Sequence, residues 1–317
     1  MRTITALFVG LGSIGTRHLK NLANLCADRG WTLQADALRS DLTRPLRPGA
    51  AELLHAQYTD LTAAPAHYDM VFITNPTSLH AEALRQVKGR GEALFIEKPI
   101  FSAEQTGLAL DELLPAGQKA YVAAPMRWCG AMLALKDRLP ALHPYCARVI
   151  CSSYLPDWRP GVDYRTVYSA RKALGGGVTI DLIHEWDYLV ELFGVPEKLY
   201  NFKGTYSELE IDSDDLSVYI AKYPTLLAEV HLDYFGRGYR RSIELFCRDG
   251  SYLADFGAGT LTLPDGTVQH YEEDVNRRYE REMEYSVDYA LTGCGESCNP
   301  PALALKVLKL TLGENVQ

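Results

Sequence analysis

The feature that most constrains the fold of this chain is a run of spaced glycines that directly follows the apolar segment TITALFV at residues 3–9. Residues 14–30 then continue with the apolar spacing of a helix. A strand, a glycine turn and a helix suit a dinucleotide, because glycines allow a tight turn, close approach to a pyrophosphate and close helix–strand packing. The helix start adds free N–H groups. The pattern therefore predicts a nucleotide site, with a purely structural turn as the alternative, at Gly10, Gly12, Ser13, Ile14 and Gly15.

The second predicted strand, at residues 32–40, indicates which dinucleotide the site prefers. Asp36 lies near the distance from the glycines at which NAD enzymes place an acid on the ribose. Ligands bind beyond the carboxyl ends of strands, however, and there the chain has Arg39 and Ser40. A guanidinium and a hydroxyl both donate to a 2′-phosphate, so this pair favours NADP, with NAD possible. A solvated loop arginine is the alternative.

Strand-like and helix-like segments alternate up to Pro125. Strands are expected at 68–74, 92–97 and 119–125, and helices at 78–87 and 102–114. Repeated βα units predict a parallel, doubly wound sheet. After Pro125 come a helix, a long series of strands and two closing helices, and consecutive strands without helices predict a mostly antiparallel sheet. The expected fold is therefore α/β, with a nucleotide-binding domain at 1–125 and a substrate-binding and oligomerisation domain at 126–317.

Composition excludes several classes of function. The net charge of −8 disfavours nucleic acid and anionic membranes as partners, and no apolar run approaches the ~18 residues of a membrane span. The seven cysteines are scattered, which favours reduced thiols in a cytoplasm. Cys294 and Cys298 are the closest pair but lack the histidine or cysteine partners of a zinc site, so no metal is expected. The apolar start of the chain runs into the glycine turn and is not interpreted as a signal peptide.

Four motifs together resemble one enzyme family. The glycine turn, NPTSLH at 75–80, EKP at 97–99 and a glycine-preceded segment with aspartate and histidine at 175–187 occur in the order found in the Gfo/Idh/MocA family. This family contains nicotinamide-dependent oxidoreductases that act mostly on sugars and cyclitols. The resemblance covers nearly the whole chain and implies a Rossmann domain followed by an α/β domain with an open sheet. It also implies that the outer face of that sheet contacts another subunit, giving a homodimer or homotetramer.

The resemblance implies roles for individual residues. Lys98 would reach the oxygen of the reacting carbon, and Glu97 would touch the ribose, or merely pair with Lys98. An ammonium beside a carbinol oxygen can hold and polarise it during hydride transfer, whereas a surface lysine is the alternative. Arg127 occupies a place where the family often has a substrate-side arginine. The nicotinamide and its ribose would be lined by Thr74, Asn75, Pro76 and His80.

A long segment at 153–177 contains prolines, glycines and several aromatic residues, so it is expected to be an ordered loop. Its aromatic faces and cations suit a sugar that carries a phosphate or carboxylate, including a nucleotide sugar. The alternative is a loop that packs on its own domain or on another subunit. The substrate-side residues expected here are Trp158, Tyr164 and Arg165, with Arg159 and Arg171 nearby.

The sequence GGGVTIDLIHEWDYL at 175–189 is expected to form a helix with Asp181, His184 and Glu185 on one face. Alone, it is best explained as an amphipathic helix with a solvated polar face. The family pattern has three residues between aspartate and histidine, whereas here two separate them. Either His184 or Glu185 is therefore the general base; His184 is favoured because imidazole titrates near neutral pH. Asp181 would orient it or contact a substrate hydroxyl.

These observations favour an NAD(P)-dependent oxidoreductase acting on the CH–OH group of a sugar or nucleotide sugar, with Lys98, His184 and Asp181 as catalytic residues. Two other functions are consistent with the same motifs. One is a glycosidase of the same fold that uses bound NAD for oxidation, elimination and re-reduction. The other is a non-catalytic dinucleotide sensor or partner subunit.

Overall fold

The computed structural model describes residues 2–292 and 296–316, which form two compact units. The first unit comprises Met1–Ala123 and Tyr279–Leu305, and the second comprises Ala124–Arg278 and Lys306–Gln317. The chain first passes from one unit to the other after Ala123, two residues before the boundary expected at 125. Residues 279–305 belong to the first unit, whereas the second unit was expected to be the single segment 126–317. The reason is packing: Met283, Val287 and Ala290 complete the core around the first sheet.

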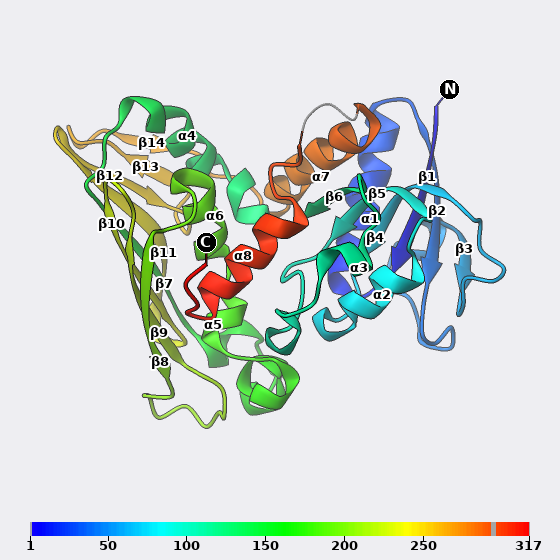
Figure 1. The fold of residues 1–317 in the computed structure, drawn as a ribbon, viewed down its shortest axis with the longest axis horizontal. Coiled ribbons are helices and arrows are strands. Elements are labelled where there is room, and N and C mark those ends of the chain that lie inside the picture. The colour runs from blue at the N-terminus through cyan, green and yellow to red at the C-terminus, as the bar shows by residue number, and fades with distance from the viewer. Residues whose placement is uncertain (1, 293–295, 317) are drawn as a thin grey trace. The chain divides into compact units, whose positions relative to one another are not determined.

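The first unit is built on a six-stranded sheet in the order β3-β2-β1-β4-β5-β6, in which every pair is parallel (Figure 1). The strands are β1 (Thr3–Val9), β2 (Thr32–Leu38), β3 (Leu54–Tyr58), β4 (Tyr68–Ile73), β5 (Gly91–Ile96) and β6 (Lys119–Val122). Strands β1, β4 and β5 are nearly continuous apolar runs, as expected for strands buried on both faces, whereas the edge strand β3 is partly exposed. The prediction of a doubly wound Rossmann sheet is confirmed.

The helices of this unit follow the glycine and proline pattern of the sequence. The longest is α1 (Ser13–Asp28), and α2 (His80–Gln86) follows β4. The helix expected at 102–114 shrinks to a short turn at Ala103–Gln105 and the single turn α3 (Leu110–Leu113), because Gly107 interrupts it. The strand β3 was not expected from the sequence. The helix α7 (Val275–Thr292) belongs to this unit from Tyr279 onward.

The second unit is built on an eight-stranded sheet in the order β14-β13-β12-β11-β7-β10-β9-β8. All neighbours are antiparallel except β7 and β10, which pair in parallel, so the prediction of a mostly antiparallel sheet is confirmed. The strands are β7 (Cys146–Tyr154), β8 (Lys198–Gly204), β9 (Leu216–Lys222), β10 (Leu227–Asp233), β11 (Phe235–Cys247), β12 (Gly250–Asp255), β13 (Thr260–Thr262) and β14 (Val268–His270).

The helices α4 (Gly130–Arg138), α5 (Val178–Asp181) and α6 (His184–Phe193) lie on one face of this sheet (Figure 1). The contact is aromatic: Trp186 of α6 packs edge-on against Tyr219 of β9, with ring centroids 5.2 Å apart. The last helix is α8 (Pro301–Thr311). Within the part of the chain that the structure describes, none of the helices has the length and hydropathy needed to cross a membrane.

Candidate nucleotide and substrate sites

The three glycines of the turn after β1 differ in the space around them. Gly10 has a φ of +84°, and a Cβ there would lie 2.7 Å from the Cα of Asn75. A Cβ on Gly15 would lie 2.7 Å from the carbonyl oxygen of Gly10, so α1 can approach β1 only through glycine. A Cβ on Gly12 would meet no atom within 4 Å. Packing therefore does not require glycine at this position, which begins the helix and leaves room for a pyrophosphate.

Thr74 and Asn75 hold this turn from the end of β4. The Thr74 hydroxyl donates to the carbonyl oxygen of Gly10 at 2.5 Å, and the Thr74 amide donates to that of Val9 at 3.0 Å. The side-chain oxygen of Asn75 is buried and has no hydrogen-bond partner among residues 2–292 and 296–316. A buried acceptor without a donor is costly, so a donor from a bound ligand fits this position. Thr74 and Asn75 thus contact the glycine turn, and Pro76 follows them in the chain.

His80 has a different role from the predicted cofactor contact. Its ring is fully buried, with Nδ1 lying 3.1 Å from the carbonyl oxygen of Ile100 and Nε2 lying 3.0 Å from that of Asn75. Burial lowers the pKa of His80, against the opposing effect of these carbonyls. His80 therefore joins the loop after β4 to the loop after β5 and does not offer a nitrogen to a ligand.

Glu97 and Lys98 follow β5 at the same edge of the sheet. Burial acts to raise the pKa of Glu97, but the hydrogen bond and charge of His18 and the charge of Lys98 outweigh it, so the pKa is lowered. His18 Nε2 lies 2.6 Å from Glu97 Oε1, and the Lys98 amide donates to Oε2 at 3.0 Å. Glu97 is thus fixed by α1 and by its own backbone. The alternative was that Glu97 merely pairs with the Lys98 ammonium. Among the described residues, no ion pair between these two side chains is present.

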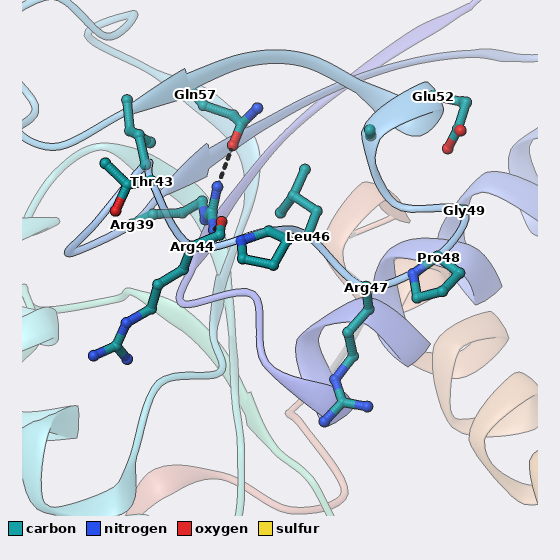
Figure 2. Close-up of a pocket in the computed structure, with 12 residues that line it drawn as sticks. Arg39, Thr43, Arg44, Leu46, Arg47, Pro48, Gly49, Glu52 and Gln57 are labelled. Carbon is teal, nitrogen blue, oxygen red and sulfur yellow. Dashed lines mark hydrogen bonds between the residues drawn. The ribbon is translucent and has the colours of Figure 1, made fainter.

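Beyond β2, the loop at 39–49 surrounds an open cavity of about 420 Å³ (Figure 2). Arg39 donates to the Gln57 side chain at 2.7 Å and to the Arg44 carbonyl oxygen, and no carboxylate in the described chain neutralises it. Arg44 and Arg47 extend from the same loop on one side (Figure 2). Sequence reasoning missed these two arginines, although three arginines within nine residues after a strand are a readable signal. The loop has the charge that a 2′-phosphate requires.

Asp36 does not serve the nucleotide. It is almost completely buried, accepts a hydrogen bond from the Tyr68 hydroxyl at 2.8 Å, and lies 3.1 Å from His55 Nδ1. The interpretation of Asp36 as a ribose-binding acid is therefore not supported, because the residue lies within β2 and its carboxylate contacts Tyr68 of β4 and His55 of β3. Ser40 lies at the exposed strand tip, next to Arg39.

In the second unit, close packing requires glycine at positions 176 and 177, whereas Gly175 has a φ of +80° and open space beside it. A Cβ on Gly176 would lie 2.0 Å from the Tyr168 carbonyl oxygen, and one on Gly177, where φ is +131°, would lie 2.4 Å from the Asp214 carboxylate. Asp214 also accepts hydrogen bonds from the amide and hydroxyl of Thr179 at 2.9 and 2.5 Å. This segment is a tightly packed turn and not an extended hinge.

The single helix expected after these glycines is instead two helices, α5 and α6, separated by Leu182 and Ile183. The expected solvated face is also wrong, since Asp181, Glu185 and Asp187 are all buried. The Asp181 carboxylate accepts the Tyr168 hydroxyl at 2.6 Å and the Tyr234 hydroxyl at 2.5 Å. Burial and the Asp181 charge raise the pKa of both tyrosines. Asp181 is thus held by two neutral phenols.

Glu185 and His184 have different environments. Glu185 forms a buried bidentate ion pair with Arg241, with Nε–Oε1 and Nη2–Oε2 distances of 2.7 and 3.1 Å. Removing it from this pair would leave a buried guanidinium without a counter-charge. His184 is the first residue of α6 and is partly exposed. Of the two residues left open as the base, His184 is the one whose side chain is not committed to an ion pair with Arg241.

The other expected substrate residues divide into buried and exposed ones. Arg127 is buried, and its guanidinium pairs with Glu191 at 2.8 Å and with Asp187 at 3.4 Å, so it stabilises α6 instead of facing a substrate. The exposed Arg165 is held by Asp163 and Glu210. The Tyr164 hydroxyl accepts the amide of Glu210 at 3.2 Å.

Trp158 is 38% exposed, donates from its ring nitrogen to Ser153 Oγ at 3.0 Å, and packs edge-on against Tyr234. Arg159 lies over the Tyr168 ring, 5.8 Å from its centroid. The loop thus places Trp158 and Tyr168 around Tyr234 and Asp181. Tyr168 was not predicted. Among the described residues no cluster of histidine, cysteine, aspartate and glutamate could hold a metal, and Cys294 lies outside them.

Comparison with known proteins identifies the first unit. The profile of the GFO_IDH_MocA oxidoreductase family, described as an NAD-binding Rossmann fold, matches residues 4–123. The chain carries the NAD-binding domain of this oxidoreductase family. The predicted resemblance to this oxidoreductase family is therefore confirmed for the domain at residues 4–123, which includes the glycine turn described above.

Curated relatives and solved structures extend the likeness beyond that domain. An uncharacterized oxidoreductase, YrbE of Bacillus subtilis, is 24% identical over 267 residues, which cover 80% of this chain and 74% of the relative. Inositol 2-dehydrogenase of Rhizobium meliloti is 26% identical over 200 residues, covering 61% of this chain and 56% of that enzyme. A levoglucosan dehydrogenase in complex with NADH and levoglucosan shares the fold, with a TM-score of 0.80 at 15% identity over 98% of this chain and 96% of that one.

Proposed function

We propose that this protein is an NADP-preferring dehydrogenase or reductase that acts on the CH–OH carbon of a sugar, cyclitol or nucleotide sugar. The observation that carries this proposal is the built dinucleotide turn: packing requires glycine at positions 10 and 15 but leaves the space beside Gly12 open. The inositol and levoglucosan dehydrogenases to which the chain is similar support a polyhydroxylated substrate. NAD is the alternative cofactor, and a nucleotide sugar is one candidate substrate, although Arg165 and Arg171 in the loop at 153–177 already pair with carboxylates.

The preference for NADP rests on the charge of the loop after β2. Arg39, Arg44 and Arg47 line one cavity, to which Glu52 also contributes, and the only carboxylate among residues 39–49 is Asp41, which lies 3.5 Å from Arg44 Nε. Asp41 is itself used by Thr43, whose amide and hydroxyl donate to it at 2.8 and 2.6 Å and lower its pKa. The second acid considered, Asp36, is buried. A 2′-phosphate would therefore meet guanidinium groups, whereas a ribose 2′-hydroxyl would find no carboxylate in this loop free to accept its proton.

When bound, the nicotinamide supplies or accepts the hydride. In the oxidative direction we propose that the Lys98 ammonium donates a hydrogen bond to the substrate oxygen, and that the His184 imidazole takes the hydroxyl proton. Carbon then loses its hydrogen with the bonding electrons, and the oxygen becomes a carbonyl. Asp181 is proposed to act at the site through Tyr168, since both of its oxygens already accept phenolic hydroxyls.

The role of Lys98 can be tested in an absorbance assay at the reduced-nicotinamide band with a panel of sugars, cyclitols and nucleotide sugars. Lys98→Met should lower turnover at least ~100-fold while leaving the Kd for NADP within about twofold, because the ammonium acts on the substrate oxygen. Lys88→Met is the matched control, since Lys88 is exposed and donates only to the Glu112 carbonyl oxygen. Full turnover of Lys98→Met would refute the proposed role. Product formation with no net absorbance change would instead favour the NAD-dependent glycosidase, and no activity with any substrate a dinucleotide sensor.

The cofactor preference has its own test. Arg39→Ala should weaken NADP binding roughly 10- to 100-fold and leave NAD binding within about threefold, because only NADP carries the 2′-phosphate. Arg85→Ala, on the helix α2, is the matched surface control. Fluorescence titration of both cofactors measures the ratio, and an equal loss for both would contradict the NADP assignment.

We further propose that two copies of the chain associate through the β8–β9 part of the sheet in the second unit. Tyr200, Phe202 and Ile220 lie side by side there on neighbouring strands and are 51%, 74% and 38% exposed. Exposed apolar clusters of this kind commonly mark subunit contacts. Phe202→Lys should shift the mass measured by light scattering toward the monomer, whereas a monomeric wild-type protein would refute the contact.

A further inference from the structure

A buried hydrogen bond between two titratable side chains ties the end of β5 to α1. His18 Nε2 lies 2.6 Å from Glu97 Oε1, and the His18 side chain is fully buried. The two residues are 79 positions apart in the sequence, so the fold alone brings them together. The proposed hydride transfer uses neither side chain. We propose that His18 is a positioning residue that acts, through Glu97, on the nicotinamide half of the dinucleotide site.

The strand order places this pair on the nicotinamide side. The order β3-β2-β1-β4-β5-β6 reverses direction at β1, and a dinucleotide lies across the crevice at such a point. The adenosine 2′-phosphate is proposed to lie beyond β2, at Arg39. The other half of the dinucleotide then lies beyond β4 and β5, and Glu97 directly follows β5. The role of His18 therefore rests on the proposed dinucleotide function.

Aromatic neighbours hold the His18 ring in place. Its centroid lies 4.7 Å from that of Phe95 in β5, and 6.1 Å from that of Tyr279 in α7, which it meets edge-on. The Tyr279 ring is in turn covered by Arg17, whose Cζ lies 4.6 Å from the ring centroid. A side chain whose rotamer is locked by packing can hold a neighbouring polar group at a fixed position. The returning segment 279–305 therefore helps to fix the imidazole against Glu97.

The hydrogen bonding of the ring is directed at Glu97. His18 Nδ1 is buried and has no hydrogen-bond partner within residues 2–292 and 296–316. Because the pKa of Glu97 is lowered, its carboxylate is the acceptor and His18 Nε2 is the donor. A buried imidazole with one nitrogen unused is costly unless the other nitrogen makes a strong bond. The bond to a carboxylate satisfies that condition.

His18 keeps the Glu97 carboxyl ionised. Burial has the largest effect on this carboxyl and raises its pKa. The hydrogen bond and the charge of His18 are the two largest opposing effects, followed by those of Lys98. The other titratable group that senses the Glu97 charge is His80, at the start of α2. Without His18, burial would dominate and Glu97 would take up a proton much closer to neutral pH.

An ionised Glu97 suits a ribose because of the acceptors that it still offers. A carboxylate has about four lone-pair sites. The His18 ring takes one site on Oε1, and the Lys98 amide takes one on Oε2 at 3.0 Å. The remaining sites can accept the ribose hydroxyls that Glu97 is expected to contact, and 9% of its side chain is exposed. A protonated carboxyl would be a weaker acceptor.

The first measurement needs no dinucleotide. The carboxyl ¹³C NMR signal of Glu97, in full-length glutamate-labelled protein and assigned with Glu97→Gln, reports its protonation directly. In His18→Leu the titration midpoint should lie at least about two pH units above that of the wild type. His18→Gln, whose amide can still donate to Glu97, should keep the midpoint low. An unchanged midpoint in His18→Leu would overturn the proposed role.

The second measurement is NADH binding, followed by nicotinamide fluorescence. NADH is used because it lacks the 2′-phosphate, which itself titrates at about pH 6. Between about pH 8.5 and about pH 6, the Kd of the wild type should change less than about twofold, whereas that of His18→Leu should rise at least about fivefold. Adding Glu97→Gln to His18→Leu should remove this pH dependence. Adding Glu104→Gln, at an exposed carboxyl, should leave it in place.

The results separate the role of His18 from the proposed function. If the wild type binds NADH and His18→Leu shows the same flat pH profile, the role of His18 is overturned and the dehydrogenase proposal stands. If neither NADH nor NADPH binds to any variant, the dinucleotide function fails, and the role of His18 fails with it. An unchanged far-UV spectrum and melting temperature establish that each variant is folded. His18→Met, which also lacks the donor, replaces His18→Leu if the latter does not fold.

Discussion

At the scale of single residues, the structure separates groups that one sequence motif placed together. Asp181, His184 and Glu185 were expected on one polar helix face. The break at Leu182 and Ile183 gives each of them a different environment: two phenols for Asp181, a position at the start of α6 for His184, and a buried guanidinium for Glu185. A motif of this kind therefore identifies the segment that carries chemistry, whereas the assignment of roles depends on what each side chain contacts.

The contrast between His184 and Glu185 leads to a prediction about the proposed base. Glu185→Gln should lower the free energy of unfolding by about 3 kcal/mol, because it leaves Arg241 buried without a counter-charge. In the oxidative direction, His184→Asn should change stability by less than about 1 kcal/mol but should remove the acid limb of the pH–rate profile, where protonation of a general base slows the reaction. Urea unfolding and pH–rate measurements on both variants check this. Loss of the acid limb in Glu185→Gln with an intact fold would reverse the assignment.

At the scale of elements, the turn between β1 and α1 shows how packing and binding divide three similar residues. Glycine is required at position 15 because a Cβ there would lie 2.7 Å from both the Gly10 carbonyl oxygen and the Thr74 hydroxyl. Gly12 has an extended backbone with a φ of −76° and open space beside it. The same amino acid therefore serves the fold at one position and leaves space for a ligand at the other.

This division predicts opposite effects for two alanine substitutions. Gly15→Ala should destabilise the protein by roughly 1–3 kcal/mol, because the Gly10 backbone and the short Thr74 side chain lie in the way. Gly12→Ala should leave the melting temperature nearly unchanged but weaken dinucleotide binding at least about tenfold, since its methyl group lies where the pyrophosphate approaches. Thermal unfolding and cofactor titration of the pair give the answer. A destabilised Gly12→Ala protein with normal cofactor affinity would contradict the assignment.

The accuracy of the helix predictions differs from one helix to another. The helix α1 was predicted within two residues of its end, because an uninterrupted apolar spacing supports it. The segments at 102–114 and 175–189 were each expected as one helix and are interrupted. Local spacing does not report where a chain must bend to satisfy contacts with β5, Asp214 or the tyrosines.

At the scale of the whole molecule, buried carboxylates in both units set the response to acid. In Glu97, burial raises the pKa, but His18 and Lys98 outweigh it, and in Asp233 burial is outweighed by His231, Ser152 and the Gly236 amide, so both values are lowered. A carboxyl whose folded pKa is depressed contributes stability above its unfolded pKa of roughly 4 and loses it as the pH falls through the folded value. The protein should therefore lose stability below about pH 4.

Glu97→Gln tests the first of these contributions. The free energy of unfolding of the variant should depend less steeply on pH over the acid range, because one carboxylate no longer takes up a proton on unfolding. Urea unfolding between about pH 7 and pH 3 measures the two slopes. Glu104→Gln, an exposed carboxyl in the same unit, should leave the slope unchanged. Identical slopes for the wild type and Glu97→Gln would show that the pKa of Glu97 is not lowered in the folded protein.

The amino-acid sequence was enough to predict the parallel sheet, the antiparallel sheet and the glycine turn between β1 and α1, because alternating apolar segments and spaced glycines encode these through local periodicity and backbone sterics. The folded structure was needed for the return of 279–305 to the first unit, the burial of Arg127 and Asp36, and the separation of His184 from Glu185. These features depend on ion pairs and hydrogen bonds between residues that lie far apart in the sequence. Burying an unpaired charge costs several kcal/mol, so the pairing dictates which polar residues face inward. Local sequence patterns do not contain that information.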